Sequence, residues 1–288
     1  MHGWLIRDKA MGPGSTQVVS AVKRALREGG YPKVKVGHGG TLDPLASGVL
    51  PIPLGEATKL GGRMLDADKV YAFTIGFGNE TSTLDAEGEV VARSDLRPTL
   101  ERVHAMLPRF TGIIEQAPPP FSALMIDGKR AYDRARAGEQ VEMKTRKVTV
   151  HSLSIRHPEL VSRSNSMSSR QSPEWKLEQV QHDGLSEITL VARVSKGTYI
   201  RSLARDIARA LGTVGHVTML RRTRAGPFAL AQAISLDFLE EAAKARALTR
   251  VVLPLEAALD DIPALPVTSR QAELLRHGQK LAGFPVSP

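Results

Sequence analysis

The stretch GHGGTLDPLASG, residues 37–48, contains one acidic side chain, that of Asp43. Glycine lacks a Cβ, so the glycines here allow another backbone or a ligand to approach closely. Pro44 restricts Asp43 to an extended or turn conformation, because proline disfavours the helical region for the residue before it. A carboxylate held in such a loop can act as a nucleophile or a general base. An Asx turn without chemistry is the more frequent reason for an isolated Asp-Pro pair, so the acid alone leaves both interpretations open.

A cation, Arg201, is predicted at the start of a helix. Apolar residues recur with helical spacing between Thr198, the expected cap, and Gly212, the expected stop. The helix dipole disfavours a positive charge in the first turn, so we expect an anionic partner for Arg201. Arg205 and Arg209 share another face of this helix, where we expect solvated side chains.

An aromatic residue, Tyr71, opens an alternating pattern. Tyr71, Phe73, Ile75 and Phe77 are spaced by two, which predicts a half-buried strand over residues 70–77. Periodicity alone favours a core role for Tyr71, although a strand end can also present a side chain to a site.

The composition limits the classes of function. Of the 288 residues, 39 are Lys or Arg and 30 are Asp or Glu, which gives a formal net charge of +9. This excess favours a polyanionic partner, since each neutralised phosphate releases counterions, but it does not separate RNA from DNA or from an anionic membrane surface. No apolar run approaches the roughly 18–20 residues of a membrane span, and the first residues lack the pattern of a secretion signal. The chain contains no cysteine, which excludes disulfides and thiolate metal sites, and these features together agree with a cytoplasmic protein.

Three separated motifs resemble those of one enzyme family. They are GHGGTLDPLASGVLP at residues 37–51 with GEATK at 55–59, KGTYIR at 196–201, and GHVTMLRRTR at 215–224. Together they are similar to the signature of the bacterial tRNA pseudouridine synthase B family, whose members isomerise uridine 55 in the T loop of transfer RNA to pseudouridine. The resemblance covers roughly residues 3–250.

The resemblance implies a role for each candidate residue. Asp43 would be the catalytic nucleophile on a flipped-out uridine, and Arg201 would pair with it, stabilising and orienting its charge. Tyr71 would contact the target base and assist proton transfer at C5. The other substrate-binding residues would be His38, Tyr199 and Leu220. The reaction requires neither a cofactor nor a metal, and the point at which Asp43 acts stays open among C1′, C6 and a sugar proton.

The resemblance also implies the fold. We expect an α+β protein with the pseudouridine synthase fold, in which a mixed, largely antiparallel central sheet carries flanking helices and a basic thumb loop. Residues 1–250 would form the catalytic domain, with a thumb-like RNA-binding loop at 119–147 and a flexible serine-rich insertion at 157–175. Residues 251–288 would form an incomplete or reduced C-terminal accessory RNA-binding segment.

Two positions depart from the family pattern. Ala10 stands where the family has a proline, and Met125 stands where it commonly has a lysine. We therefore expect a looser turn at the first position and weaker RNA contact at the second. Arg221, Arg222 and Arg224 keep the basic pattern of the third motif and are predicted phosphate ligands.

Two other functions remain open from the sequence. A non-catalytic RNA-binding or tRNA-folding module could use the same basic surface, but phosphate binding has no use for Asp43, and tritium release from 5-tritiated uridine would separate the two. A metal-dependent hydrolase could use His38 and Asp43, but no third ligand stands at motif spacing. We therefore expect transfer RNA as the partner, bound through its T arm, with no membrane, no obligatory protein partner and a monomeric state.

Overall fold

The computed structural model describes residues 1–122, 124–126, 128–139, 143–156, 184–260, 262–263 and 265–281. These residues form two compact units, Met1–Ala258 and Leu259–Pro288. The serine-rich insertion predicted at 157–175 lies outside the described residues. Among the helices that the structure describes, none has the length and apolar character needed to cross a membrane.

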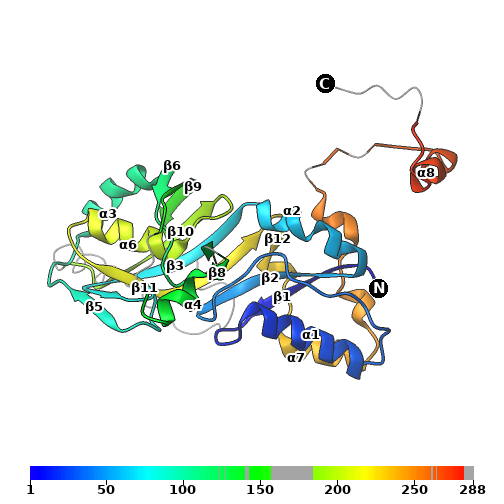
Figure 1. Ribbon diagram of the computed structural model, residues 1–288, viewed down its shortest axis with the longest axis horizontal. Helices are drawn as coiled ribbons and strands as arrows, with labels where there is room; N and C mark the ends of the chain where they lie inside the picture. The colour runs from blue at the N-terminus through cyan, green and yellow to red at the C-terminus, as the bar shows by residue number, and fades with distance from the viewer. Residues whose placement is uncertain are drawn as a thin grey trace, which may run out of the picture. The chain divides into compact units, whose positions relative to one another are not determined.

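A mixed sheet forms the centre of the first unit (Figure 1). Its described strands are β1 (Gly3–Lys9), β2 (Ala46–Leu54), β3 (Lys69–Phe77), β6 (Gly112–Gln116), β9 (Arg146–Ile155), β10 (Glu187–Val194), β11 (Gly215–Ala225) and β12 (Phe228–Ala229). The strand order is β1-β2-β11-β3-β10-β9-β6, and β12 pairs with β11. β2 and β11 run parallel, whereas the other described pairs in this sheet are antiparallel. The expected mixed, largely antiparallel sheet is therefore confirmed.

Helices and two small hairpins complete the described chain. The helices are α1 (Ser15–Glu28), α2 (Gly61–Asp66), α3 (Leu100–Met106), α4 (Ala131–Arg136), α6 (Ile200–Ala210), α7 (Leu236–Lys244) and α8 (Ser269–Arg276). One hairpin pairs β4 (Asn79–Thr81) with β5 (Val90–Arg93), and the other pairs β7 (Met125–Ile126) with β8 (Lys129–Arg130). α1 and α7 pack together beside β1 and β2 (Figure 1), while α6 packs on β11 and β3.

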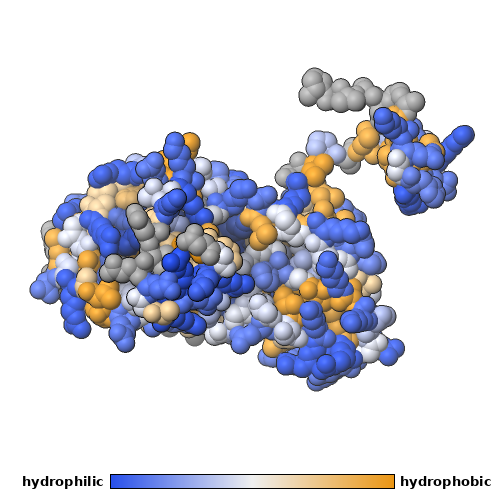
Figure 2. All heavy atoms as spheres, viewed as in Figure 1, coloured by the Kyte–Doolittle hydropathy of each residue, from blue (hydrophilic) through white to orange (hydrophobic). Residues whose placement is uncertain are grey.

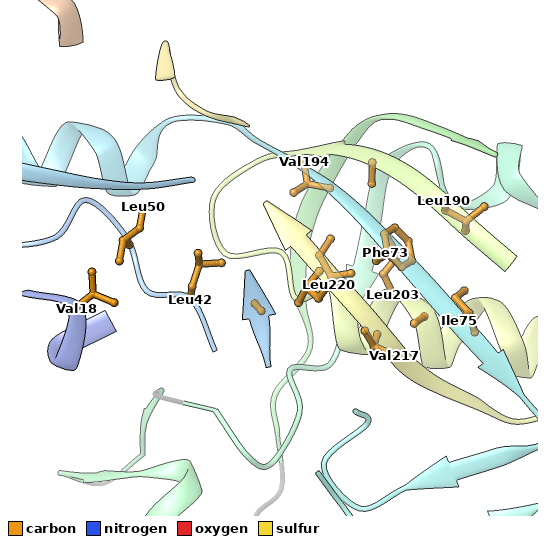
Figure 3. Close-up of a cluster of buried hydrophobic side chains, with 14 of the residues drawn as sticks. Val18, Leu42, Leu50, Phe73, Ile75, Leu190, Val194, Leu203, Val217 and Leu220 are labelled. Atoms are coloured by element: carbon orange, nitrogen blue, oxygen red, sulfur yellow. The ribbon is translucent and has the colours of Figure 1, made fainter. Parts of the chain in front are cut away.

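The apolar stripe of α6 packs on the sheet. Figure 3 shows Leu203 of α6 among Phe73 and Ile75 of β3 and Val217 and Leu220 of β11, and all five belong to one buried cluster. The alternation in β3 and the helical spacing in α6 therefore both mark core faces, as the sequence predicted. This packing fixes the first turn of α6 above β11.

The cap of α6 differs from the prediction. Tyr199 is the N-cap residue, and no side chain caps the helix there. Thr198 does not act as the cap, because its hydroxyl donates a hydrogen bond to the carbonyl of Ser195 at 3.0 Å. The Thr198 side chain, which was predicted to cap the helix, therefore stabilises the turn before the helix instead.

Candidate active site

The loop that carries Asp43 is held from the side of β1 and α1. The buried ammonium of Lys9, at the end of β1, donates to the carbonyls of Ala10, Pro44 and Ala46. The hydroxyl of Ser15 accepts from the backbone N–H of Leu42 at 2.8 Å, on the other side of the acid. The backbone is thus fixed immediately before and after Asp43, which leaves little conformational freedom to lose when the carboxylate acts.

Burial lowers the pKa of Lys9 from its ordinary value of 10.5 to about 8. The nearby Asp43 carboxylate opposes this shift, and the positive charge of Arg222 adds to it. Lys9 is therefore a cation whose charge lies close to the candidate nucleophile.

Arg222, on β11, holds the backbone on both sides of Asp43. Its side chain is 1% exposed and donates to the carbonyls of Val49 (2.8 Å), Thr41 (3.3 Å) and Gly40 (3.3 Å). The prediction that Arg222 binds phosphate is wrong, because a buried guanidinium occupied by backbone carbonyls cannot reach a nucleic acid. Arg221 lies at the surface paired with Asp8 at 2.8 Å, and Arg224 is exposed.

The last glycine of the motif allows the parallel pairing of β2 with β11. Gly48 lies opposite Arg222 and has a φ of +104°, which is unfavourable for other residues. A Cβ built on Gly48 would lie 2.1 Å from the carbonyl oxygen of Arg222. The motif therefore needs glycine here because the two backbones approach too closely for a side chain.

Arg201 contacts two carboxylates from the first turn of α6. Its Nη2 lies 2.8 Å from Oδ2 of Asp43, and its Nη1 lies 3.2 Å from Oδ2 of Asp85. The side chains of Arg201 and Asp85 are both 7% exposed, whereas that of Asp43 is 37% exposed. The anionic partner expected for this cation is present, and there are two of them.

The backbone around Asp85 is shaped to meet Arg201. The carbonyl of Thr83 accepts from Nη1 of Arg201 at 2.9 Å, and the Thr83 hydroxyl donates to Oδ1 of Asp85. Between them, Leu84 has a φ of +62°, an uncommon conformation for a bulky residue. This strained residue lets the Thr83 carbonyl and the Asp85 carboxylate face the same guanidinium, and such strain is typical of functional sites.

A small, open pocket lies at the Asp43–Arg201 pair. Its lining residues are Asp43, Leu45, Asp85, Arg201, Val217, Thr218, Met219 and Leu220. One wall therefore carries the charged side chains of Asp43, Asp85 and Arg201, and the other is formed by β11 and is mostly apolar. Leu220 is both a wall of this pocket and part of the buried core cluster.

The other candidate residues, Tyr71, His38 and Tyr199, are not among the described residues that line this pocket. Tyr71 lies on β3 opposite Arg222 and packs half-buried against the core cluster. His38 lies in the segment that Gly37 and Gly39 bind to β2, and its Nδ1 is buried without a hydrogen-bond partner in the described structure. Burial and the charge of Arg222 lower the pKa of His38, so its imidazole is neutral at pH 7.

Tyr199 lies beneath a guanidinium. The Cζ atom of Arg146 is 5.0 Å from the centroid of the Tyr199 ring. The backbone N–H of Tyr199 donates to the side-chain Oε1 of Gln116 at 2.8 Å. The ring is therefore held by a stacked cation and the backbone by a buried amide.

Of the two arginines of α6 that were predicted to be solvated, Arg205 is largely buried, whereas the side chain of Arg209 is 56% exposed, as predicted. Arg205 bonds Asp206 at 2.8 Å and the carbonyl of Ala117, and its side chain is 13% exposed. Arg209 forms two hydrogen bonds with Glu80, whose side chain is 9% exposed. Both arginines tie α6 to neighbouring segments, which the charge pattern of the helix alone does not reveal.

The described part of the segment 119–147, which was predicted to be a thumb loop, presents basic and aromatic side chains. The Cζ atoms of Arg130 and Arg136 lie 5.8 and 5.6 Å from the ring centroid of Tyr132. Met125 on β7 is 63% exposed, so its departure from lysine falls at the surface. Hydrophilic residues predominate on the face shown in Figure 2.

Sequence reasoning did not single out Lys9, Asp85 or Gln116 as parts of this site. Lys9 resembles an ordinary charged strand end, and Asp85 resembles an ordinary turn residue before Gly88. Their importance arises from partners far along the chain, and local patterns carry no signal of such partners.

Comparison with known proteins identifies the family and several relatives of this chain. Residues 24–200 match the model of the TruB family pseudouridylate synthase N-terminal domain, and residues 201–260 match the tRNA pseudouridylate synthase B C-terminal domain. The chain is 58% identical over 286 residues to tRNA pseudouridine synthase B of Novosphingobium aromaticivorans, covering 99% of this chain and 87% of that protein. It is 57% identical over 286 residues to the protein of the same name from Zymomonas mobilis, covering 99% and 86%.

A solved structure shares the fold. The crystal structure of a Cbf5-Nop10-Gar1 complex matches with a TM-score of 0.67 and 26% sequence identity, covering 97% of this chain and 68% of that one. The family models span most of the chain, and the relatives align over nearly all of it. The chain therefore belongs to the TruB family of pseudouridylate synthases.

Proposed function

We propose that the chain isomerises uridine 55 in the T loop of transfer RNA to pseudouridine, with Asp43 as the nucleophile on a flipped-out uridine. Membership of the TruB family makes the chain a pseudouridylate synthase, an isomerase that acts on uridine in transfer RNA. The observation that carries the role of Asp43 is its position in a pocket, 2.8 Å from Arg201.

The reaction moves the glycosidic bond of one nucleotide. The bond between C1′ and N1 breaks, the uracil turns, a bond between C1′ and C5 forms, and the proton of C5 is replaced by one on N1. No atom is gained or lost apart from exchange of these protons. The target base must leave its stack to expose these atoms, and loop nucleotides of RNA do so at low cost.

The pocket supports the proposed roles of Asp43, Arg201 and Leu220, whereas the roles of the other candidate residues rest on the resemblance to the family. The carboxylate of Asp43 is partly exposed and can reach a substrate, while the nearly buried Arg201 orients it through a charge-assisted hydrogen bond. Leu220 supplies an apolar wall for the uracil. Tyr71 contacts the base and transfers the proton at C5, and the remaining contacts to the nucleotide come from His38 and Tyr199.

The basic surface supports binding of the T arm. The arginines around Tyr132 in the thumb offer guanidinium and aromatic groups of the kind that bind RNA. Residues 251–288 add a further RNA contact in this proposal, and a single copy of the chain acts in the cytoplasm without an obligatory protein partner. Binding of an isolated T-arm hairpin, compared with that of whole transfer RNA, measures how much of the affinity this arm supplies.

Substitution of the acid tests the assignment. Asp43→Asn keeps the size and polarity of the side chain but removes the nucleophile, so tritium release from 5-tritiated uridine in transfer RNA should fall by roughly 10³-fold or more. Transfer RNA should still bind. Asp95→Asn, at an exposed position, is the matched control and should release tritium at the wild-type rate. Near wild-type release by Asp43→Asn would refute the assignment, and binding without release by the wild-type chain would favour a non-catalytic RNA-binding module.

A further inference from the structure

Gln116 and Arg146 lie side by side at one end of the β6–β9 pair, and neither has a catalytic role in the proposed function. Gln116 is the last residue of β6, Arg146 is the first residue of β9, and they are register partners in that antiparallel pair. The intervening chain, 117–145, contains most of the proposed thumb. The thumb therefore leaves and re-enters the sheet through Gln116 and Arg146.

Gln116 holds the backbone of Tyr199. Gln116 is 1% exposed. Its Nε2 donates to the carbonyl of Tyr199 at 3.1 Å, and its Oε1 accepts from the N–H of Tyr199 at 2.8 Å. Both ends of one buried amide are thus satisfied by one residue, which fixes that residue against rotation and translation. Arg201 follows two residues later, in the first turn of α6.

Arg146 holds the ring of the same residue. Its guanidinium stacks on Tyr199 with Cζ 5.0 Å from the ring centroid, and its Nη2 donates to the carbonyl of Gly197. The next segment continues this attachment, because the hydroxyl of Ser202 donates to the carbonyl of Ala117 at 2.8 Å. The two ends of the thumb therefore grip the turn that leads into α6.

We propose that Gln116 and Arg146 are positioning residues that clamp Tyr199 and thereby place Arg201 on Asp43, so that the thumb and the active site share one anchor. The inference rests on the proposed function, since it assigns Tyr199 to the nucleotide pocket and Arg201 to the nucleophile. Neither residue touches the reacting atoms. Their contribution is geometric, and misplacement of a catalytic group by about 1 Å can cost about 10²-fold in rate.

The test uses Gln116→Met, Arg146→Met and the double variant in the full chain. Single-turnover tritium release is measured with enzyme in excess over transfer RNA, and the affinity for transfer RNA and the unfolding temperature are measured separately. Arg193→Met is the control, because Arg193 is an exposed arginine on the neighbouring strand β10 and pairs with Asp68 at the surface. It removes the same charge without touching the clamp.

We expect each single variant to lower the single-turnover rate by about 10-fold or more at saturating enzyme, with the affinity for transfer RNA changed by no more than about twofold. The double variant should be little slower than the slower single variant, because both side chains act through one residue. Arg146 is only partly buried, so Arg146→Met decides the matter if Gln116→Met does not fold.

Two results would overturn the proposal. In one, a folded single variant keeps the wild-type rate. In the other, Arg146→Met loses affinity while its rate at saturation is unchanged, which would make Arg146 an RNA ligand. An inactive wild-type chain would instead refute the proposed function, and the clamp with it, so the two failures are distinguishable.

Discussion

Arg201 and Asp43 lie 2.8 Å apart, although one stands in a helix and the other in a loop far earlier in the chain. The guanidinium is almost buried, and Asp85 occupies its second edge at 3.2 Å. In the proposed reaction Asp43 loses its negative charge, whether it forms a covalent bond or takes a proton, and Asp85 then still balances the buried cation. The second acid therefore lets the first one react without leaving an unpaired charge in the protein.

Removal of the second acid should weaken the fold. Asp85→Asn leaves the buried Arg201 with one carboxylate, and breaking a buried ion pair typically costs about 3–5 kcal/mol of the free energy of unfolding. Urea denaturation measures this cost. Asp68→Asn is the control, since Asp68 is one-third exposed and pairs with Arg193 at the surface, where such a pair contributes at most about 1 kcal/mol. Equal losses in the two variants would contradict the central role of Asp85.

Two glycines with similar backbone angles should respond differently to alanine. Gly48 has a φ of +104° and Gly112 a φ of +92°, so both substitutions impose a strain of about 1–2 kcal/mol. At Gly48 the added Cβ also meets the carbonyl of Arg222 at 2.1 Å, whereas at Gly112 nothing lies within 4 Å. We expect Gly48→Ala to lower the unfolding temperature well beyond Gly112→Ala and to reduce activity. Similar unfolding temperatures would show that the close approach of β2 and β11 is unimportant.

Two buried lysines should make stability depend on alkaline pH. Burial lowers the pKa of Lys9 and of Lys69 from 10.5 to about 8, and the charge of Arg222 contributes to both shifts. Between these values the unfolded chain binds more protons than the folded chain, so the contribution of these groups to the free energy of unfolding rises with pH from about 8 to about 10.5. Below pH 8 both states are protonated, and the cost of burying the charges is fully present.

Comparison of variants isolates this effect from other groups that titrate in the same interval. Lys9→Met should flatten the rise measured by urea unfolding, whereas Lys23→Met, at an exposed position of α1, should leave it unchanged. An identical pH profile for Lys9→Met and the wild type would refute the expected proton uptake.

Salt dependence should separate the buried arginine from its exposed neighbour. Arg224→Gln should reduce the slope of log affinity for transfer RNA against log salt by roughly 1, if its exposed side chain neutralises one phosphate. Arg222→Gln should leave that slope unchanged and instead destabilise the fold by about 1–3 kcal/mol, because three backbone carbonyls lose their donor. A lower slope for Arg222→Gln would show that its guanidinium reaches the RNA.

Regular elements and one long-range ion pair, that of Arg201 with Asp43, could be predicted from the sequence, whereas the other long-range polar contacts could not. The apolar periodicities of α6 and β3 identify faces that the structure buries. The pairing of Arg201 with Asp43 followed from the resemblance, and the helix dipole argument independently required an anion. The occupation of Arg222 by carbonyls and the second acid at Asp85 depend on the fold as a whole, because any backbone can offer a carbonyl and any turn can hold an aspartate.

The parallel ladder between β2 and β11 has a mechanical consequence. It consists of three residue pairs, from Ala46 with Leu220 to Gly48 with Arg222, and in the described sheet it joins the antiparallel β1–β2 pair to the remaining strands. Asp43 belongs to the β1–β2 side of this junction and Arg201 to the other. If the pairing of this short ladder shifted by one residue, Asp43 and Arg201 would no longer face each other. The proposed chemistry therefore depends on the alignment of a few peptide groups.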